Sequence, residues 1–166
     1  MDKTTYFYPN KTLRTGNGLL DLSTPAIMGI LNVTPDSFFD GGKFEGVDAA
    51  LAQTETMLEE GADIIDIGGM SSRPGASIIS ADEEMSRVLP VIDAIHKRFA
   101  DVILSIDTIY SQTAAAAIDA GAGIINDISA AALDANIIQV AIDKKLPYIL
   151  MHMQGKPQDM QTAPVY

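Results

Sequence analysis

The sequence predicts an α/β protein whose helices and parallel strands form a TIM-type (β/α)8 barrel. Short runs rich in isoleucine and valine recur after Pro25, and a longer helical stretch separates each run from the next. Such alternation is typical of consecutive βα units around a parallel sheet. No glycine-rich dinucleotide fingerprint follows the first run, which favours a barrel over a doubly wound sheet.

A short β-hairpin is expected before the repeating part of the chain. The sequence Gly16-Asn17-Gly18 separates residues 11–14 from residues 19–22, and glycine and asparagine readily adopt the backbone angles of a tight hairpin turn. We therefore divide the chain into a hairpin preface at residues 1–24 and a barrel part at residues 25–166.

Five apolar runs predict strands that are buried on both faces, because they are nearly continuous in isoleucine, leucine and valine. The runs are Ala26–Val33, Asp63–Gly68, Val102–Asp107, Gly123–Ile128 and Pro147–Met151. A complete barrel needs eight strands and about 250 residues. We therefore expect a partial barrel of about five parallel strands, and a chain that stops before the site is complete.

Helices are expected between these strands, at Val47–Glu60, Ala81–Phe99, Ser111–Ala120 and Leu133–Lys145. In the second, Ser80 and Glu83 have the spacing of a capping box. A stripe along this helix should face the sheet, consisting of Met85, Val88, Leu89, Ile92 and Ile95. Two helix-to-strand junctions, residues 60–66 and 120–126, are near copies, and Gly61 and Gly121 should take the left-handed conformation there.

Composition excludes several classes of partner. Acidic residues outnumber basic ones by 22 to 11, and the formal net charge of −11 disfavours nucleic acid and anionic membrane surfaces.

The chain shows neither a membrane-length apolar run nor a signal-peptide pattern, so we expect a cytoplasmic location. Cysteine is absent, which rules out disulfides and thiolate zinc sites. An anionic substrate would need an arginine, a metal ion or backbone N–H groups.

Polar residues mark the carboxyl end of each predicted strand. They are Asn32, Asp66, Asp107, Asn126 with Asp127, and His152. In a parallel barrel these ends open onto the face that carries the active site. Turn-rich loops follow the first two strands, and the second loop combines Ser71, Ser72 and Arg73, a set that suits a phosphate or pyrophosphate group.

Two segments carry a specific family resemblance. Residues 28–38, Met-Gly-Ile-Leu-Asn-Val-Thr-Pro-Asp-Ser-Phe, resemble the first signature of the dihydropteroate synthase family. Residues 66–76, Asp-Ile-Gly-Gly-Met-Ser-Ser-Arg-Pro-Gly-Ala, resemble its second signature. Shorter matches lie at residues 105–108, 125–128 and 151–155. At positions 70 and 72, methionine and serine stand where glutamate and threonine are more usual in that family.

The resemblance implies an enzyme of folate biosynthesis. Such an enzyme condenses 6-hydroxymethyl-7,8-dihydropterin pyrophosphate with p-aminobenzoate, giving 7,8-dihydropteroate and pyrophosphate. The resemblance also implies Mg²⁺ as cofactor, competition by sulfonamides and a homodimer. Elements that the family carries later in its chain have no counterpart here: a pterin-binding aspartate loop, a Ser-x-Lys motif and a final Arg-x-His. We therefore expect the chain alone to bind weakly and to turn over little.

The resemblance also assigns roles to individual residues. Asp107 and Asn126 match the pair that holds the pterin ring and acts in catalysis, and Asn32 matches the contact to magnesium and pyrophosphate. The remaining substrate-binding positions are Arg73 for pyrophosphate, Ile128 and Met151 for the apolar pterin pocket, and Phe38, Ser71, Ser72 and Pro74 for loops that close around p-aminobenzoate.

Two other functions remain open at this stage. A pterin-binding module without catalysis would bind the ring but release no pyrophosphate. A corrinoid-type methyltetrahydrofolate methyltransferase domain shares the barrel and the aspartate and asparagine pair. That domain lacks the loop Asn-Val-Thr-Pro-Asp-Ser-Phe, which is present here at residues 32–38.

Overall fold

The computed structural model describes residues 11–16, 18–34, 43–70 and 78–152, and its main feature is a five-stranded parallel sheet. The strands are β3 (Met28–Asn32), β4 (Ile64–Gly68), β5 (Ile103–Asp107), β6 (Ile124–Asp127) and β7 (Tyr148–Leu150). They lie side by side in chain order. A doubly wound sheet reverses its strand order at a switch point, so this order confirms the predicted barrel-type arrangement.

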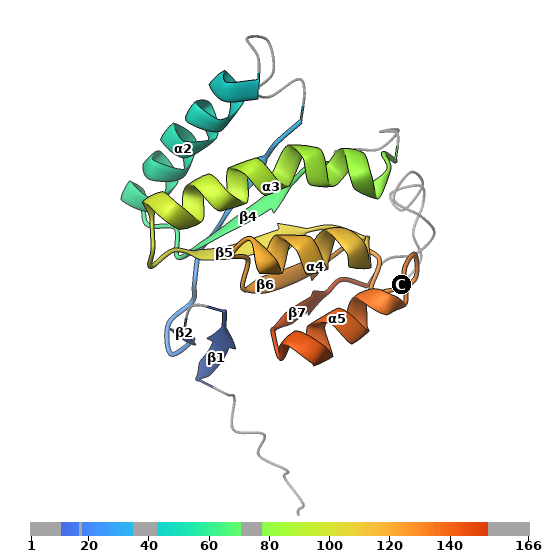
Figure 1. Cartoon of the computed structure of the whole chain (residues 1–166). Coiled ribbons are helices and arrows are strands. Elements are labelled where there is room, and N and C mark those ends of the chain that lie inside the picture. The colour runs from blue at the N-terminus through green and yellow to red at the C-terminus, as the bar shows by residue number, and fades with distance from the viewer. Residues whose placement is uncertain (1–10, 17, 35–42, 71–77, 153–166) are drawn as a thin grey trace, which may run out of the picture.

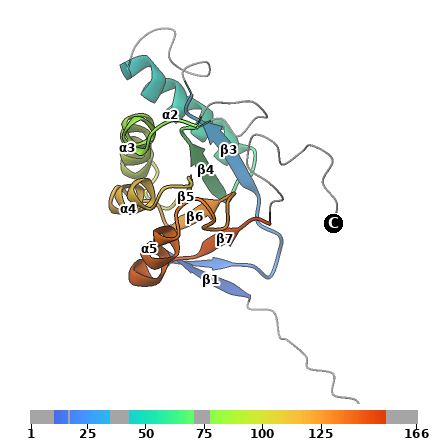
Figure 2. The ribbon, with the colours of Figure 1, turned by 90° about the vertical axis from the view of Figure 1, so that its right-hand side faces the viewer.

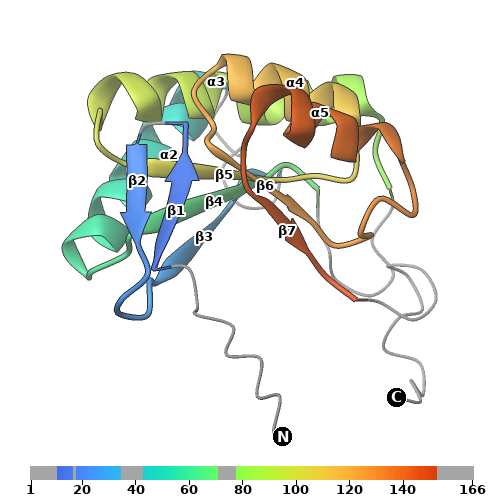
Figure 3. The same cartoon turned by 90° about the horizontal axis from the view of Figure 1, so that it is seen from below.

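In the part of the chain that the structure describes, the helices cover one face of this sheet (Figures 1 and 3). They are α2 (Lys43–Glu59), α3 (Ala81–Arg98), α4 (Ser111–Asp119) and α5 (Asn136–Lys144). Because each βα crossover has the same hand and the strands follow one another, successive helices fall on the same side. Among the described residues, no helix lies on the other face (Figure 2), where Ile30 is 67% exposed.

The hydrophobic core fills the space between the helices and the sheet. Alternate residues of the strands point into it, among them Leu31, Ile65, Ile67, Leu104, Ile106 and Ile125. Helix α3 meets them with Glu84, Val88, Val91, Ile92 and Ile95, whereas Met85 and Leu89 are only half-buried. The observed stripe keeps Val88, Ile92 and Ile95 of the expected one, but it has Glu84 and Val91 in place of Met85 and Leu89 and so includes a carboxyl group.

The start of α3 confirms half of the predicted capping box. The Ser80 hydroxyl accepts a hydrogen bond from the backbone N–H of Glu83 at 3.2 Å. The Glu83 carboxylate pairs instead with Arg87, one turn further along the helix. The cap therefore satisfies one of the free N–H groups of the first turn, which is its main energetic contribution.

The predicted hairpin is present as strands β1 (Thr12–Thr15) and β2 (Gly18–Asp21), a separate antiparallel pair. It packs against the start of β6, where a Cβ atom on Gly123 would lie only 2.7 Å from the backbone nitrogen of Gly16. This close approach fixes the hairpin at the amino end of the parallel sheet (Figure 1). The division at residue 24 stays a prediction.

Both repeated helix-to-strand junctions contain the expected left-handed glycine. The φ angle is 101° at Gly61 and 124° at Gly121. At Gly121 a Cβ atom would also lie 2.5 Å from Cγ of His96, so glycine is required there for space as well as conformation.

No helix in the described ranges is long and apolar enough to cross a membrane.

Candidate active site

One row of the parallel sheet brings the predicted polar residues together. Asn32 is paired in register with Gly68, Gly68 with Asp107, and Asp107 with Asn126. Residues paired in this way across parallel strands point to the same side of the sheet. The three polar side chains therefore lie at the carboxyl ends of β3, β5 and β6, on the face that has no helices in the described part of the chain (Figure 2).

The glycine in this row keeps a space open between two of the polar groups. A Cβ atom on Gly68 would lie 3.4 Å from Oδ2 of Asp107 and 3.8 Å from Oδ1 of Asn32. These distances show that the Asp107 carboxylate and the Asn32 amide both reach over Gly68. A ligand group can therefore contact the carboxylate and the amide at once.

Asp107 has an unusual electrostatic environment. Its burial, together with the negative charges of Asp66, Glu84 and Asp127, raises the pKa of Asp107 from 3.8 to about 7. Loss of hydration and like-charge repulsion both disfavour the ionised form of a carboxyl group. A group that titrates near neutral pH and lies among polar side chains at the carboxyl end of a barrel sheet is a strong candidate for chemistry.

Asp66 lies two residues before Gly68 on β4, in the next row of paired residues on the same face of the sheet, and contacts Asn126. The Nδ2 group of Asn126 donates a hydrogen bond of 2.9 Å to Oδ2 of Asp66. Asp66 is only 4% exposed, and its burial raises its pKa, although the Ser105 and Asn126 side chains oppose that rise. This buried carboxylate thus binds directly to one of the two residues predicted to hold the ring.

Glu84 approaches the same region from behind the sheet. It extends from the first turn of α3, is fully buried, and accepts a hydrogen bond of 2.5 Å from the Thr108 hydroxyl. Burial raises the pKa of Glu84, against the effect of the Thr108 and Thr113 side chains and of the positive charge of Arg87. Glu84 and Thr108 fix the turn that follows Asp107.

Asp127 organises the loop that follows β6. Its carboxylate accepts hydrogen bonds from the backbone N–H groups of Ser129 and Ala131, at 2.7 and 2.8 Å, and from the Tyr148 hydroxyl at 2.5 Å. Ala130 and Ala131 have φ angles of 51° and 64°, a strained conformation for residues with a side chain. The Asp127 contacts hold this strained loop beside Asn126.

The other predicted site residues fall into two groups. Ile128 and Met151 are half-buried and follow directly after the ends of β6 and β7, so they lie near the polar row. The loop residues lie outside the described part of the chain; these are Phe38, Ser71, Ser72, Arg73 and Pro74. Their assignment stays a prediction.

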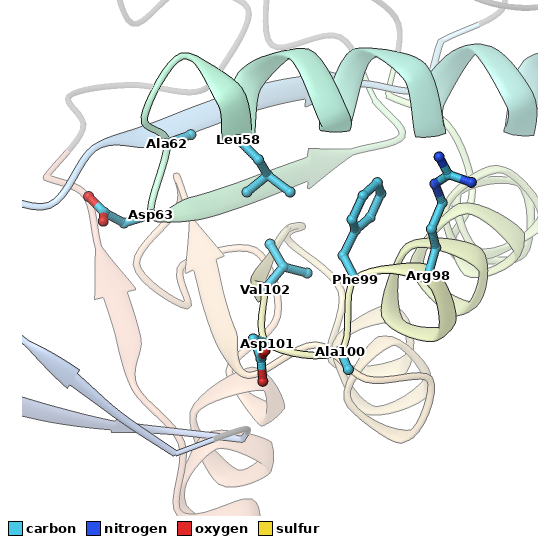
Figure 4. Close-up of a pocket in the computed structure, with 8 residues that line it drawn as sticks. All are labelled: Leu58, Ala62, Asp63, Arg98, Phe99, Ala100, Asp101 and Val102. Atoms are coloured by element: carbon cyan, nitrogen blue, oxygen red, sulfur yellow. The ribbon is translucent and has the colours of Figure 1, made fainter.

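A cavity of about 460 Å³ lies at the opposite end of the sheet (Figure 4). Leu58, Phe99 and Val102 line it, with Arg98 and Asp101 at its margin. It lies beside the residues that precede β4 and β5 and contains none of the predicted site residues. In a parallel barrel the active site forms at the other end of the strands, so we do not assign this cavity to the site.

Sequence reasoning placed Asp66 among the polar residues at the strand ends but gave it no role, and it did not name Glu84. A signal existed for each. Asp66 interrupts the run Ile64-Ile65-Asp66-Ile67, and a charged residue inside a buried strand is uncommon without a partner. Glu84 lies four residues before Val88 and therefore on the buried stripe of α3.

Comparison with known proteins identifies the family. Residues 28–166 match the family model described as pterin binding enzyme. Dihydropteroate synthase of Haemophilus influenzae is 49% identical over 154 residues, which are 93% of this chain and 55% of that protein.

Two solved structures are similar in fold and sequence. Xanthomonas albilineans dihydropteroate synthase with 4-aminobenzoic acid has a TM-score of 0.82 at 44% identity, over 94% of this chain and 54% of that one. Yersinia pestis dihydropteroate synthase with a sulfonamide drug has a TM-score of 0.82 at 48% identity, over 93% of this chain and 56% of that one.

The chain spans about half the length of these bacterial relatives. The family match nevertheless extends over most of the chain, and the row of Asn32, Asp107 and Asn126 lies within it. The chain therefore belongs to the pterin-binding enzyme family.

Proposed function

We propose that the site acts in dihydropteroate synthesis. The reaction joins 6-hydroxymethyl-7,8-dihydropterin pyrophosphate to p-aminobenzoate and releases pyrophosphate. The observation that carries the proposal is the row of Asn32, Asp107 and Asn126 on one face of the sheet, with a carboxyl group that titrates near neutral pH. The bacterial relatives named dihydropteroate synthase, at almost half identity, support it.

Asp107 and Asn126 are suited to bind the edge of a pterin ring. Such an edge presents N–H donors beside nitrogen and oxygen acceptors. An ionised carboxylate offers only acceptors, whereas an amide offers both kinds of group, so the pair can match a mixed edge. Ile128 and Met151 would supply apolar contacts to the ring faces, as apolar side chains do in most small-molecule sites.

The chemistry proposed for the ring methylene is a displacement. The bond from the methylene carbon to pyrophosphate breaks and its electron pair leaves with pyrophosphate. The p-aminobenzoate nitrogen then forms a new bond to that carbon and loses a proton. Positive charge spreads into the ring between these events. The negative charge of Asp107, with Asp66 and Glu84 close by, would stabilise it in a partly dry site.

Asn32 is the residue proposed to contact Mg²⁺. Its exposed side chain lies on the same face as Asp107, and magnesium prefers oxygen ligands while keeping several waters. Within the described ranges no three histidine, aspartate or glutamate side chains gather in a way that could hold a metal alone. One amide oxygen with substrate phosphates therefore fits. The ion would neutralise charge on pyrophosphate.

The family resemblance supports three further parts of the proposal. Arg73 would bind pyrophosphate, and Phe38, Ser71, Ser72 and Pro74 would close around p-aminobenzoate. The complete enzyme would be a cytoplasmic homodimer. Sedimentation of the whole gene product tests the dimer, and substitution of Arg73 by alanine should weaken binding of the pyrophosphate substrate more than binding of the free pterin.

The function is tested by combining ligand titration with product analysis. The whole gene product is titrated with the dihydropterin pyrophosphate and Mg²⁺, then supplied with p-aminobenzoate while pyrophosphate and dihydropteroate are quantified. Formation of both products supports the proposal. Pterin binding without pyrophosphate release would identify a binding module instead. Absence of pterin binding would remove the proposal altogether.

A further inference from the structure

We propose that Asp66 is a positioning residue, which holds the Asn126 amide with its carbonyl oxygen turned toward the ligand. The inference deepens the proposed function and rests on it for the identity of the ligand. Asp66 occupies the row below Gly68 and Asp107, and its Oδ2 atom receives the hydrogen bond from Nδ2 of Asn126. The bond links two strands that are not neighbours, because β5 lies between β4 and β6.

The burial of Asp66 argues against direct contact with a ligand. The residue is 4% exposed, and its second oxygen, Oδ1, is sealed from solvent. Ser105, its register partner on β5, is fully buried, and its hydroxyl oxygen is sealed from solvent as well. Asp66 and Ser105 together form a closed polar layer under the site. Asp66 can therefore act on a ligand only through the side chains above it.

The hydrogen bond between the pair fixes the orientation of the amide. Nδ2 of Asn126 is the donor and Oδ2 of Asp66 the acceptor, so Asn126 presents its NH2 group to Asp66. Its carbonyl oxygen then points away from Asp66 and is available to an N–H donor of the ring. Without Asp66 the amide could rotate, and a reversed amide would oppose a donor to that N–H group. Asp66 thus selects which ring edge Asn126 recognises.

A double-mutant cycle on pterin affinity tests this coupling. The dissociation constant of 6-hydroxymethylpterin is measured by fluorescence for the wild type, Asp66→Leu, Asn126→Ala and the double variant. We expect Asp66→Leu to weaken binding roughly tenfold, as loss of one buried hydrogen bond does. In the Asn126→Ala background the same substitution should have almost no further effect. An equal, additive loss in both backgrounds would overturn the proposal.

A conservative variant separates orientation from structural damage. Asp66→Asn keeps an acceptor oxygen for Asn126, so it should recover most of the affinity that Asp66→Leu loses, with a remaining loss of about threefold because the acceptor is no longer charged. Asp101→Asn, an exposed aspartate at the opposite end of the sheet, is the matched control for the charge change. If Asp66→Leu does not fold, the cycle is run with Asp66→Asn, and an equal loss in both backgrounds again counts against the proposal.

A ligand-free measurement keeps this inference distinct from the proposed function. The Asn126 side-chain amide protons are followed by NMR in the wild type and both Asp66 variants. A hydrogen-bonded proton that is lost in Asp66→Leu and retained in Asp66→Asn supports the positioning role even if no pterin binds. Unchanged Asn126 resonances in Asp66→Leu would refute the role even if the wild type binds pterin.

Discussion

The two ends of the parallel sheet differ in how they accommodate charge. At the carboxyl end, Asp66 and Glu84 are buried and Asp107 is half-buried near them, and the pKa of each carboxyl group is raised. At the amino end, charged groups are exposed and paired, as in the contact between Arg98 and Glu55. Folding alone gives no reason to bury like charges together, because each such group costs free energy. The contrast indicates that the carboxyl end is arranged for binding and chemistry.

The amino end shows instead how close packing stabilises the fold. Gly16 and Gly123 bring two backbone segments into direct contact, and Phe99 receives the Arg98 guanidinium over its ring at 5.3 Å. These contacts satisfy ordinary packing and electrostatic requirements. Changes at the two ends should therefore have opposite consequences: loss of ligand at the carboxyl end, and loss of stability without loss of ligand at the amino end.

The largest expected effect is on ligand binding by Asp107→Asn. The substitution removes a partly buried carboxylate that is proposed to accept hydrogen bonds from the ring, so pterin affinity should fall roughly 100-fold. Turnover in the whole gene product should fall at least as much. Titration calorimetry at pH 8 measures the affinity, with Asp101→Asn as control. Unchanged affinity would remove Asp107 from the site.

The same variant should be more stable than the wild type at high pH. In the folded protein the pKa of Asp107 is raised from 3.8 to about 7. Between these pH values the folded protein binds a proton at Asp107 that the unfolded chain does not bind. The free energy of unfolding therefore falls as pH rises through this range. At pH 8, Asp107→Asn should gain on the order of 3 kcal/mol in unfolding free energy. Urea unfolding at pH 8 and pH 4 measures it. The gain should disappear at pH 4, and a gain independent of pH would contradict the electrostatic explanation.

Two glycine substitutions sharpen the comparison of the ends. Gly123→Ala places a methyl group 2.7 Å from a backbone nitrogen, and this overpacking should cost about 1–3 kcal/mol of stability while pterin affinity is retained. In Gly68→Ala the added methyl group would lie 3.4 Å or more from its nearest neighbours, so the fold should tolerate the substitution. The added methyl group would nevertheless fill the space between Asn32 and Asp107 and reduce affinity. Melting curves and titrations of both variants should show opposite patterns.

The smallest expected effect comes from Arg98→Ala. The variant loses an exposed ion pair with Glu55 and a contact with Phe99, which together should contribute about 0.5–1 kcal/mol. Pterin affinity should not change, because Arg98 lies beside the cavity at the amino end (Figure 4). Urea unfolding in low and high salt would show whether the ion pair contributes. A change in pterin affinity would show that the two ends are coupled.

The sequence predicted the order and type of every described element because the signals were local. Runs such as Ile64–Gly68 are mostly apolar, and Gly61 and Gly121 mark the ends of helices. The row of Asn32, Asp107 and Asn126 was also predictable, since in-register parallel strands of similar length end together.

The contribution of Asp66 and Glu84 depended on three-dimensional contacts. Asp66 contacts Asn126 across an intervening strand, a pairing that depends on the register of three strands. Glu84 and Glu83 are adjacent acidic residues in one helical turn, yet only Glu84 is buried. Which of the two is buried depends on how α3 is rotated about its own axis on the sheet. The stripe predicted from the sequence included Met85 in place of Glu84, so Glu84 was not recognised as buried.

Side-chain NMR of the protein during a pterin titration tests the central claim most directly. The claim predicts that the Asn32 and Asn126 amide signals and the Asp107 carboxyl carbon shift together and saturate at one dissociation constant. Signals of Phe99 and Arg98, at the other end of the sheet, should not move. Shifts confined to Phe99 and Arg98, with Asp107 and Asn126 unchanged, would contradict the account.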